Sequence, residues 1–248
     1  MPGNELGTAM ILSGRIADVA HVPESRFGQW FLATDTWAVH VLTRAIDDLE
    51  RLIADRRAAY PVAVDVGCGF GRSFRLLQER FSAERLIGVD IETEALARSA
   101  RQAERDGLTV ELVHASSSDL PLPSRSADIV FCHQTLHHLV EQENALREFH
   151  RILKPGGLFL LAESTRAYIH SWIIRLLFRH PMHVQRTADE YLAMVRAAGF
   201  SVDPSAVSYP YLWWSRQDLG LAERLLGIKP TPGHEETLIN LVAVKRPQ

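Results

Sequence analysis

The sequence has few cysteines, no block of like charges and no long apolar run. Only Cys68 and Cys132 occur among its 248 residues, too few for a disulfide framework. Its 27 basic and 30 acidic residues give a net charge of −3 with no basic cluster, which argues against a nucleic-acid partner. No segment reaches the roughly 20 apolar residues of a transmembrane helix, and residues 1–13 do not resemble a secretion signal. We therefore expect a cytoplasmic protein.

Hydrophobic residues make up 46% of the chain and charged residues 23%, which predicts a sizeable packed core. After residues 1–33, where we expect loops and a short helix, apolar spacing predicts a helix over 34–58, capped by Thr34 or Asp35 and ended by Pro61. Strands and helices then alternate, with strands predicted at 62–66, 85–90, 110–114, 128–133, 158–162, near 202–209 and at 238–245. This alternation predicts an α/β fold with a doubly wound sheet.

A glycine turn follows the first of these strands. Gly67, Gly69 and Gly71 have the spacing G-x-G-x-G, and such a turn presents backbone N–H groups and a helix N-terminus to a ligand. Asp90 ends the next strand, about 20 residues further on, where a carboxylate can accept hydrogen bonds from ribose hydroxyls. Arg72 stands where a dinucleotide fingerprint has its third glycine, which disfavours a pyrophosphate site. A tight strand-to-helix connection without a ligand is the structural alternative.

Several segments resemble the class I S-adenosylmethionine-dependent methyltransferase superfamily, in particular the branch with ubiquinone- and menaquinone-biosynthesis enzymes and many small-molecule methyltransferases. They are Val64–Gly71, Gly88–Ile91, Ser118–Pro123, Ala127–Phe131 and Arg151–Gly157. Together they are specific, although each one alone is not. The resemblance implies S-adenosylmethionine as cofactor and S-adenosylhomocysteine as product. It also implies a seven-stranded Rossmann-like sheet, whose antiparallel last strand lies between the fifth and sixth, with helical cap elements.

This resemblance also suggests how the chain is divided. We expect an N-terminal helical cap over residues 1–60 and a methyltransferase domain over 61–248, with cap insertions at about 167–183 and 210–236. Apolar residues at helical spacing predict a helix over 167–180. That helix can be a lid over the acceptor, part of the core, or a peripheral membrane contact.

The resemblance implies roles for the cofactor-site residues. The glycine turn should bring bare backbone against the methionine part, with Asp65 toward its ammonium group. Asp90 should hold the ribose, Ile91 should face the adenine, and Asp119 should accept a hydrogen bond from the adenine amino group, unless it is only a turn residue. The cofactor-binding candidates are Asp65, Gly67, Cys68, Gly69, Gly71, Asp90, Ile91, Ser118, Asp119, Leu120 and His133.

Three histidines lie at the end of the fourth predicted strand or just after it. A sulfonium methyl group is already activated, so alignment of the acceptor is the main requirement. An oxygen or nitrogen acceptor can also need a base, and histidine titrates in the useful range. His137 and His138 are the candidate general bases, whereas His133 is expected to border the cofactor. No known zinc spacing is present, so we predict no metal site.

The acceptor is expected to be a small molecule. Amino-methylating nucleic-acid enzymes of the superfamily carry an Asn/Asp-Pro-Pro-aromatic motif after the fourth strand, where this chain has Cys132–Thr135. Aromatic residues outside the motifs predict an apolar or aromatic acceptor, with ordinary core packing as the alternative. The pocket candidates are Phe27, Trp30, Trp37, Trp172, Tyr211, Trp213 and Trp214.

Two other functions fit parts of the sequence. A nicotinamide-dependent oxidoreductase would share the sheet and Asp90, but the glycine spacing opposes it. A non-catalytic S-adenosylmethionine-binding subunit would keep every motif without turnover. The sequence leaves open the identity of the acceptor, the atom that is methylated, and whether the chain forms a homodimer.

Overall fold

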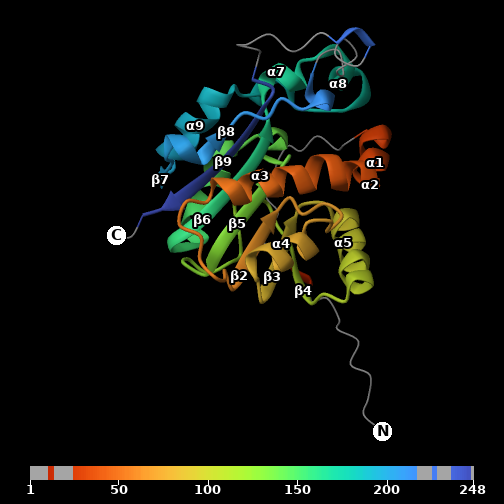
Figure 1. Ribbon diagram of the computed structural model, residues 1–248. Helices are drawn as coiled ribbons and strands as arrows, with labels where there is room; N and C mark the ends of the chain where they lie inside the picture. The colour runs from red at the N-terminus through yellow and green to blue at the C-terminus, as the bar shows by residue number, and fades with distance from the viewer. Residues whose placement is uncertain (1–10, 14–24, 217–224, 228–235, 247–248) are drawn as a thin grey trace.

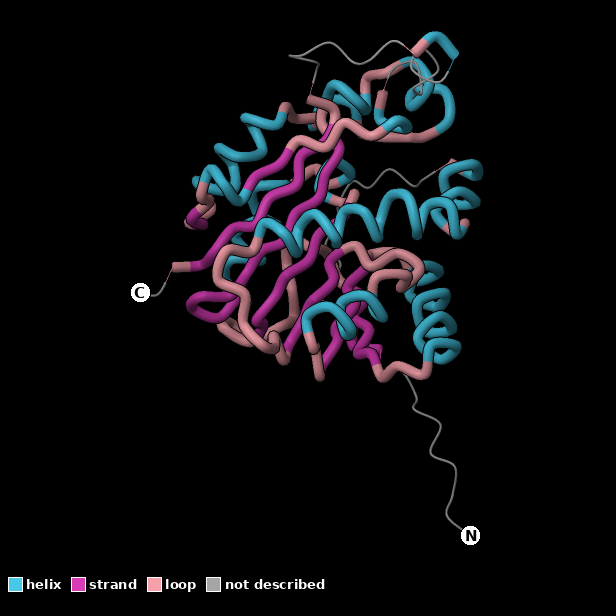
Figure 2. Tube along the Cα trace, in the orientation of Figure 1, coloured by secondary structure: helices cyan, strands magenta, loops and turns pink. Residues whose placement is uncertain are grey.

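The computed structural model describes residues 11–13, 25–216, 225–227 and 236–246. Within them, one nine-stranded sheet forms the middle layer, with helices on both faces (Figures 1 and 2). The strands are β1 (Ile11–Ser13), β2 (Val62–Val66), β3 (Arg85–Asp90), β4 (Val110–His114), β5 (Ala127–His133), β6 (Leu153–Ser164), β7 (Phe200–Ser201), β8 (Val207–Ser208) and β9 (Leu238–Lys245). The α-helices are α1 (Arg26–Leu32), α2 (Asp35–Trp37), α3 (Arg44–Leu52), α4 (Phe74–Phe81), α5 (Thr93–Asp106), α6 (Gln142–Ile152), α7 (Arg166–Ile169), α8 (Trp172–Leu177) and α9 (Ala188–Ala197). A π-helix, η1 (Ala38–Thr43), precedes α3, and the 3₁₀ turns are η2 (Leu136–His138), η3 (Met182–Val184), η4 (Pro204–Ala206) and η5 (Trp213–Ser215).

The strands lie in the order β1-β4-β3-β2-β5-β6-β9-β7, and β8 pairs with β9. Neighbours from β1 to β6 are parallel, whereas β9 is antiparallel to β6, β7 and β8. The predicted α/β fold and the antiparallel last strand are therefore confirmed. The prediction of seven strands missed β1, which lies where we expected loops, and the split of one predicted strand into β7 and β8. Segments of two or three residues show no detectable period.

Successive residues of each inner strand face two separate cores. In β5, Ile129 and Phe131 pack with α3, α4 and α5, whereas Val130 and Cys132 pack with α6 and α9. This follows because neighbouring side chains of a strand point to opposite faces. A sheet covered on both faces needs apolar residues at most positions, which explains the nearly continuous apolar runs in the sequence. Because helices cover both faces, a ligand is expected to reach the sheet at the ends of its strands.

The predicted N-terminal helix begins where expected and ends early. Thr34 caps it, because its Oγ1 accepts a hydrogen bond from the Trp37 N–H at 3.2 Å. The helical run then continues through η1 and α3. It stops before Ile53, whose backbone is extended, and not at Pro61. Residues 54–58 are exposed, so no apolar packing holds a further turn in place.

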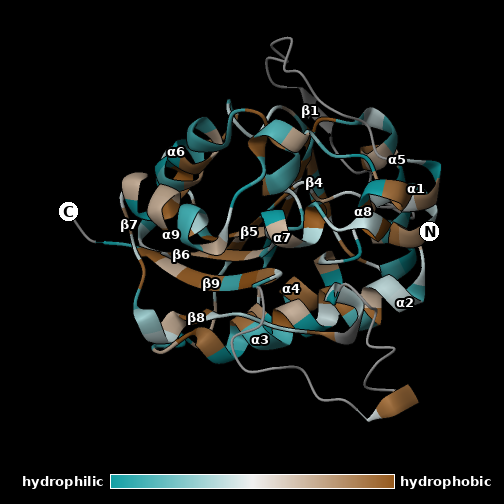
Figure 3. Cartoon of the chain, turned by 90° about the horizontal axis from the view of Figure 1, so that it is seen from above, coloured by the Kyte–Doolittle hydropathy of each residue, from teal (hydrophilic) through white to brown (hydrophobic). Residues whose placement is uncertain are grey.

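The segment predicted as one helix over 167–180 is two short helices, α7 and α8. Ser171 between them is extended, with φ −60° and ψ 148°. In one continuous helix, residues five apart point about 140° away from each other. The break allows both Ile169 and Ile174 to be buried, while Trp172 is 67% exposed. In the view from above, α8 lies next to α1, and α7 lies nearer the middle of the molecule (Figure 3). No helix of the described part is long and apolar enough to cross a membrane.

Candidate active site

The three glycines of the turn after β2 all have positive φ, but they serve different purposes. A Cβ on Gly67 would collide with the side chain of Thr135, and a Cβ on Gly71 would press against the ring of Phe74. A Cβ on Gly69 would meet, among the described residues, only the Gly67 carbonyl oxygen, at 4.0 Å. Gly67 and Gly71 therefore permit close packing, whereas Gly69 faces open space.

A cavity of about 200 Å³ lies beside this turn, at the carboxyl ends of β2 and β3. β2 lies between β3 and β5, and the helices that follow β2 and β5 cover opposite faces of the sheet. A crevice forms at such a point in open α/β sheets. Five of the predicted cofactor residues line the cavity, namely Gly67, Gly69, Asp90, Ile91 and Ser118.

Asp90 is fixed at the edge of this cavity by backbone donors. Its Oδ2 accepts a hydrogen bond from the Gly69 N–H, and its Oδ1 accepts one from the Glu92 N–H, both at 2.9 Å. Burial raises the pKa of Asp90, and the hydrogen bonds from Glu92 and Gly69 oppose that shift. The strand end and the glycine turn thus hold one another in position.

Asp65, Cys68 and His133 line a smaller adjoining cavity of about 100 Å³, which also includes the glycine turn. Burial raises the pKa of Asp65 to about 7, although Ser73 Oγ donates a hydrogen bond to its carboxylate. Burial also lowers the pKa of His133 to about 4, so this imidazole is neutral at pH 7. The structure therefore brings these three predicted residues together beside the first cavity.

The other predicted cofactor residues lie apart from these cavities. Gly71 packs against a ring, Asp119 is exposed, and Leu120 is buried in the core. Ser116 and Ser117 line the 200 Å³ cavity instead, and sequence reasoning passed over both. The signal was present, because they come two and three residues after the end of β4, at the edge where ligands collect.

Sequence reasoning also missed Glu163, a fully buried carboxylate near the end of β6. Its Oε2 accepts hydrogen bonds from the N–H groups of Thr135 at 3.1 Å and Leu136 at 2.6 Å. Its Oε1 accepts one from the Ser164 N–H at 2.8 Å and lies 2.5 Å from His137 Nδ1. Glu163 therefore holds the turn after β5 and the ring of His137. The sequence did contain a signal for this residue, because Glu163 is a single acidic residue directly after the apolar run 158–162.

Another cavity, mostly apolar and of about 260 Å³, is bounded by α1, η2, α7 and α8. Three of the predicted pocket residues line it, namely Phe27, Trp37 and Trp214. Its other walls include Tyr168, Ile169, Ile173, Ile174, Leu177, Phe178 and the histidines His137, His138 and His180. The predicted cap segment thus contributes much of the apolar wall.

The 200 Å³ cavity beside the glycine turn and the 260 Å³ apolar cavity adjoin each other. Leu32, Gln134 and His138 line both. Gln134 has φ 51°, and its Oε1 accepts a hydrogen bond from Ser164 Oγ at 2.5 Å. The turn after β5 is therefore held at the boundary between the cavities.

Three of the predicted pocket residues that the structure describes, Trp30, Trp172 and Tyr211, are not in the wall of the apolar cavity. Trp30 and Trp172 are 61% and 67% exposed. Tyr211 lies under the guanidinium group of Arg216, 5.1 Å from its ring centroid. The side chain of Trp213 lies outside the described residues, as does most of the predicted 210–236 insertion.

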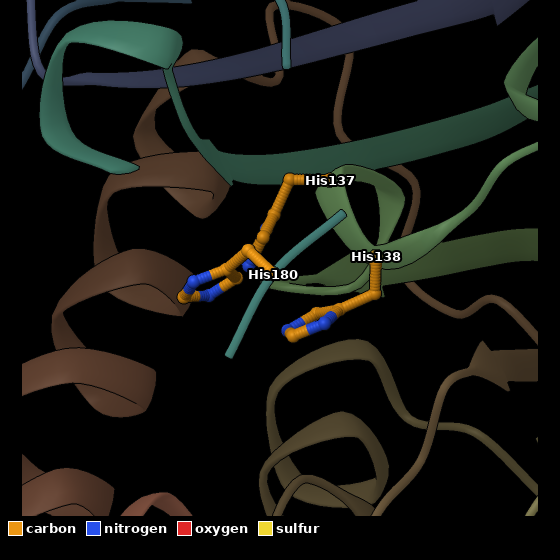
Figure 4. Close-up of side chains that lie close together, drawn as sticks. All are labelled: His137, His138 and His180. Atoms are coloured by element: carbon orange, nitrogen blue, oxygen red, sulfur yellow. The ribbon is translucent and has the colours of Figure 1, made fainter. Parts of the chain in front are cut away.

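Three histidine rings gather in the wall of the apolar cavity (Figure 4). The ring centroids of His137 and His138 are 4.2 Å apart, and His180 lies 4.9 and 4.8 Å from them. Burial, with a smaller effect of His137, lowers the pKa of His180 to about 3. His180 comes from the loop after α8, so no spacing along the sequence could associate it with the other two.

Comparisons with known proteins agree with this geometry. The family described as methyltransferase domain matches residues 64–161. A probable S-adenosylmethionine-dependent methyltransferase of Mycobacterium tuberculosis is 30% identical over 201 residues, covering 74% of this chain and 70% of that protein. A similarly described protein of Mycolicibacterium smegmatis is 28% identical over 203 residues, covering 82% and 70%. A putative methyltransferase from Bacillus halodurans has the same fold, with a TM-score of 0.60 and 18% identity over 81% of this chain and 100% of that one. The chain therefore belongs to the class I S-adenosylmethionine-dependent methyltransferases, and S-adenosylmethionine is its cofactor.

Proposed function

We propose that the enzyme methylates a small apolar or aromatic molecule held in the 260 Å³ cavity, with the cofactor in the 200 Å³ cavity. The observation that carries this proposal is the shared wall of Leu32, Gln134 and His138. A sulfonium group at that wall presents its methyl group directly to the neighbouring cavity. Alignment of this kind supplies about 7–11 kcal/mol in favourable cases. Mostly apolar walls with few polar groups are typical of small-molecule pockets.

The charges around the smaller cavity support a cationic cofactor. A positive group next to Asp65 favours its carboxylate form and so counteracts the burial that raises its pKa to about 7. His133, whose pKa burial lowers to about 4, is neutral and does not repel the cofactor. In this proposal Asp65 faces the ammonium group, and Asp90 holds the ribose.

We expect Asp90→Ala to weaken S-adenosylmethionine binding about tenfold or more. Each hydrogen bond to a charged acceptor is worth about 1.5–3 kcal/mol, and 1.4 kcal/mol corresponds to a tenfold change in Kd. Calorimetric titration measures the effect. Asp203→Ala, in an exposed turn between β7 and η4, is the matched control and should bind normally. Unchanged affinity in folded Asp90→Ala would remove this carboxylate from the cofactor site.

His138 is the group placed to take a proton from the acceptor. His138 lines both cavities, whereas His137 lines only the apolar one. The proton of an acceptor O–H or N–H group passes to His138, and the freed electron pair forms a bond to the methyl carbon. The carbon–sulfur bond would break as this bond forms, with its electrons on sulfur, which would leave S-adenosylhomocysteine.

The direct test combines calorimetry with a product screen. Purified protein is titrated with S-adenosylmethionine and then incubated with panels of apolar, aromatic and polar acceptors, with detection of S-adenosylhomocysteine and the methylated product. The proposal requires cofactor binding and turnover on apolar or aromatic compounds. Turnover only on polar acceptors would contradict the assignment of the pocket. Binding without any turnover would favour a non-catalytic subunit.

The acceptor pocket has its own prediction. Ile173 of α8 lines the cavity, whereas Leu176 on the same helix is 73% exposed. We expect Ile173→Asp to raise the KM for an apolar acceptor about 10- to 100-fold, because burial of such a side chain contributes about 1.5–3 kcal/mol. Cofactor affinity and the KM of Leu176→Asp should not change. Equal KM values in the two variants would place the acceptor elsewhere.

A further inference from the structure

His137, His138 and His180 form a group whose ligand atoms all lie within 4.8 Å of one another. Two of these residues belong to η2 after β5, and the third follows α8. The three rings converge on one place although they come from distant parts of the chain (Figure 4). His137 is buried, and the other two are half-buried. Imidazole nitrogens are common ligands of divalent transition metals.

Glu163 is a second, independent feature of a metal site. It lies 2.5 Å from His137 Nδ1, and three backbone N–H groups hold its carboxylate in place. When Nδ1–H donates to this carboxylate, the lone pair of the ring is on Nε2. A histidine that ligates a metal commonly donates its other nitrogen to a carboxylate, which fixes the ring and raises its basicity. The pair therefore has the arrangement of a metal ligand with its supporting group.

We propose that His137, His138 and His180 bind one divalent transition-metal ion of the Zn²⁺ type. With Zn–N bonds of about 2.0–2.1 Å, three tetrahedral nitrogens lie about 3.3 Å apart. The present ligand atoms lie within 4.8 Å of one another, so each pair has to approach by at most about 1.5 Å to reach that spacing. Three protein ligands leave a fourth position for water or substrate, as in catalytic rather than structural sites.

The fourth position lies on the acceptor side, because all three histidines line the apolar cavity. This part of the inference rests on the proposed function. Coordination of an acceptor hydroxyl lowers its pKa, so that its proton passes to solvent water. The oxygen lone pair then forms the bond to the methyl carbon as the carbon–sulfur bond breaks onto sulfur. Coordination uses the lone pair of His138, so the bound ion replaces that residue as the activating group.

Metal binding itself is tested without any acceptor. Untagged protein is stripped with a chelator and titrated with Zn²⁺ by calorimetry and with Co²⁺ by visible absorption. We expect one ion per chain. His180→Ala should weaken binding at least about 100-fold, and Glu163→Gln, which removes the supporting charge and one of the two acceptor oxygens, about 10- to 100-fold. His183→Ala is the matched control, because this exposed histidine is three residues away and should bind like the original protein.

A second variant distinguishes the loss of a metal ligand from a loss of metal binding caused by misfolding. His180→Cys offers a thiolate in place of imidazole, so it should retain Co²⁺ and add a sulfur-to-cobalt absorption band. Absence of binding by the original protein, no effect of His180→Ala, or an equal loss in His183→Ala would each overturn the metal site.

Cofactor titration and turnover are measured with and without the ion. Turnover by chelated protein without any metal binding would refute the site and leave the proposed function standing. Metal binding without turnover on any acceptor would refute the proposed function alone.

Discussion

Gly69→Val is expected to weaken S-adenosylmethionine binding at least about a hundredfold, equivalent to about 2.7 kcal/mol, while the fold remains intact. The Cβ of a residue at this position meets, among the described residues, only a carbonyl oxygen at 4.0 Å. The valine methyl groups therefore project into the cavity, where the cofactor must approach bare backbone. Calorimetric titration measures the loss, and circular dichroism with thermal unfolding checks the fold.

Gly107→Val is the control for this experiment. Gly107 has φ 68° at the end of α5, similar to φ 52° at Gly69, and a Cβ there meets nothing within 4 Å among the described residues. Both variants should lose stability by a similar amount, because a left-handed conformation costs an L-residue about 1–2 kcal/mol. Only Gly69→Val should lose the cofactor. Normal binding by that variant would mean that the cofactor does not approach the glycine turn.

His138→Ala is expected to lower kcat by about 10²–10⁴ in metal-free protein, with little change in cofactor affinity. The reason is its position, since it lines both the cofactor cavity and the acceptor cavity. His137→Ala should also lower kcat, because it removes the ring that Glu163 holds against the neighbouring histidines. Single-turnover rates with saturating cofactor measure the chemical step.

The control is His170→Ala, since this histidine is exposed at the end of α7. It should keep full activity. If His137→Ala and His138→Ala both turn over at the original rate, methyl transfer depends on alignment alone. The general-base role would then be dropped, whereas the cofactor and acceptor cavities would stand.

Local sequence determined the sheet and the cofactor turn. Buried parallel strands need mostly apolar residues on both faces, so Val62–Val66 and the strands after it appear as nearly continuous apolar runs. Positive φ at Gly67, Gly69 and Gly71 needs glycine, which leaves a visible spacing. Asp90 ends a strand next to that turn in the sheet, and the alternation of elements predicts this adjacency. Each of these features depends on residues close together in the chain.

Tertiary packing decided what the sequence could not show. Whether Glu163 faces solvent or His137 depends on the pairing of β5 with β6, and that pairing buries the carboxylate at the turn. His180 reaches the other histidines because the helical segment is interrupted at Ser171 and the following residues fold back over the cavity. The exposure of Asp119 likewise follows from the path of one loop. Contacts between distant segments arise from burial and steric fit across the whole fold, which local spacing along the chain does not encode.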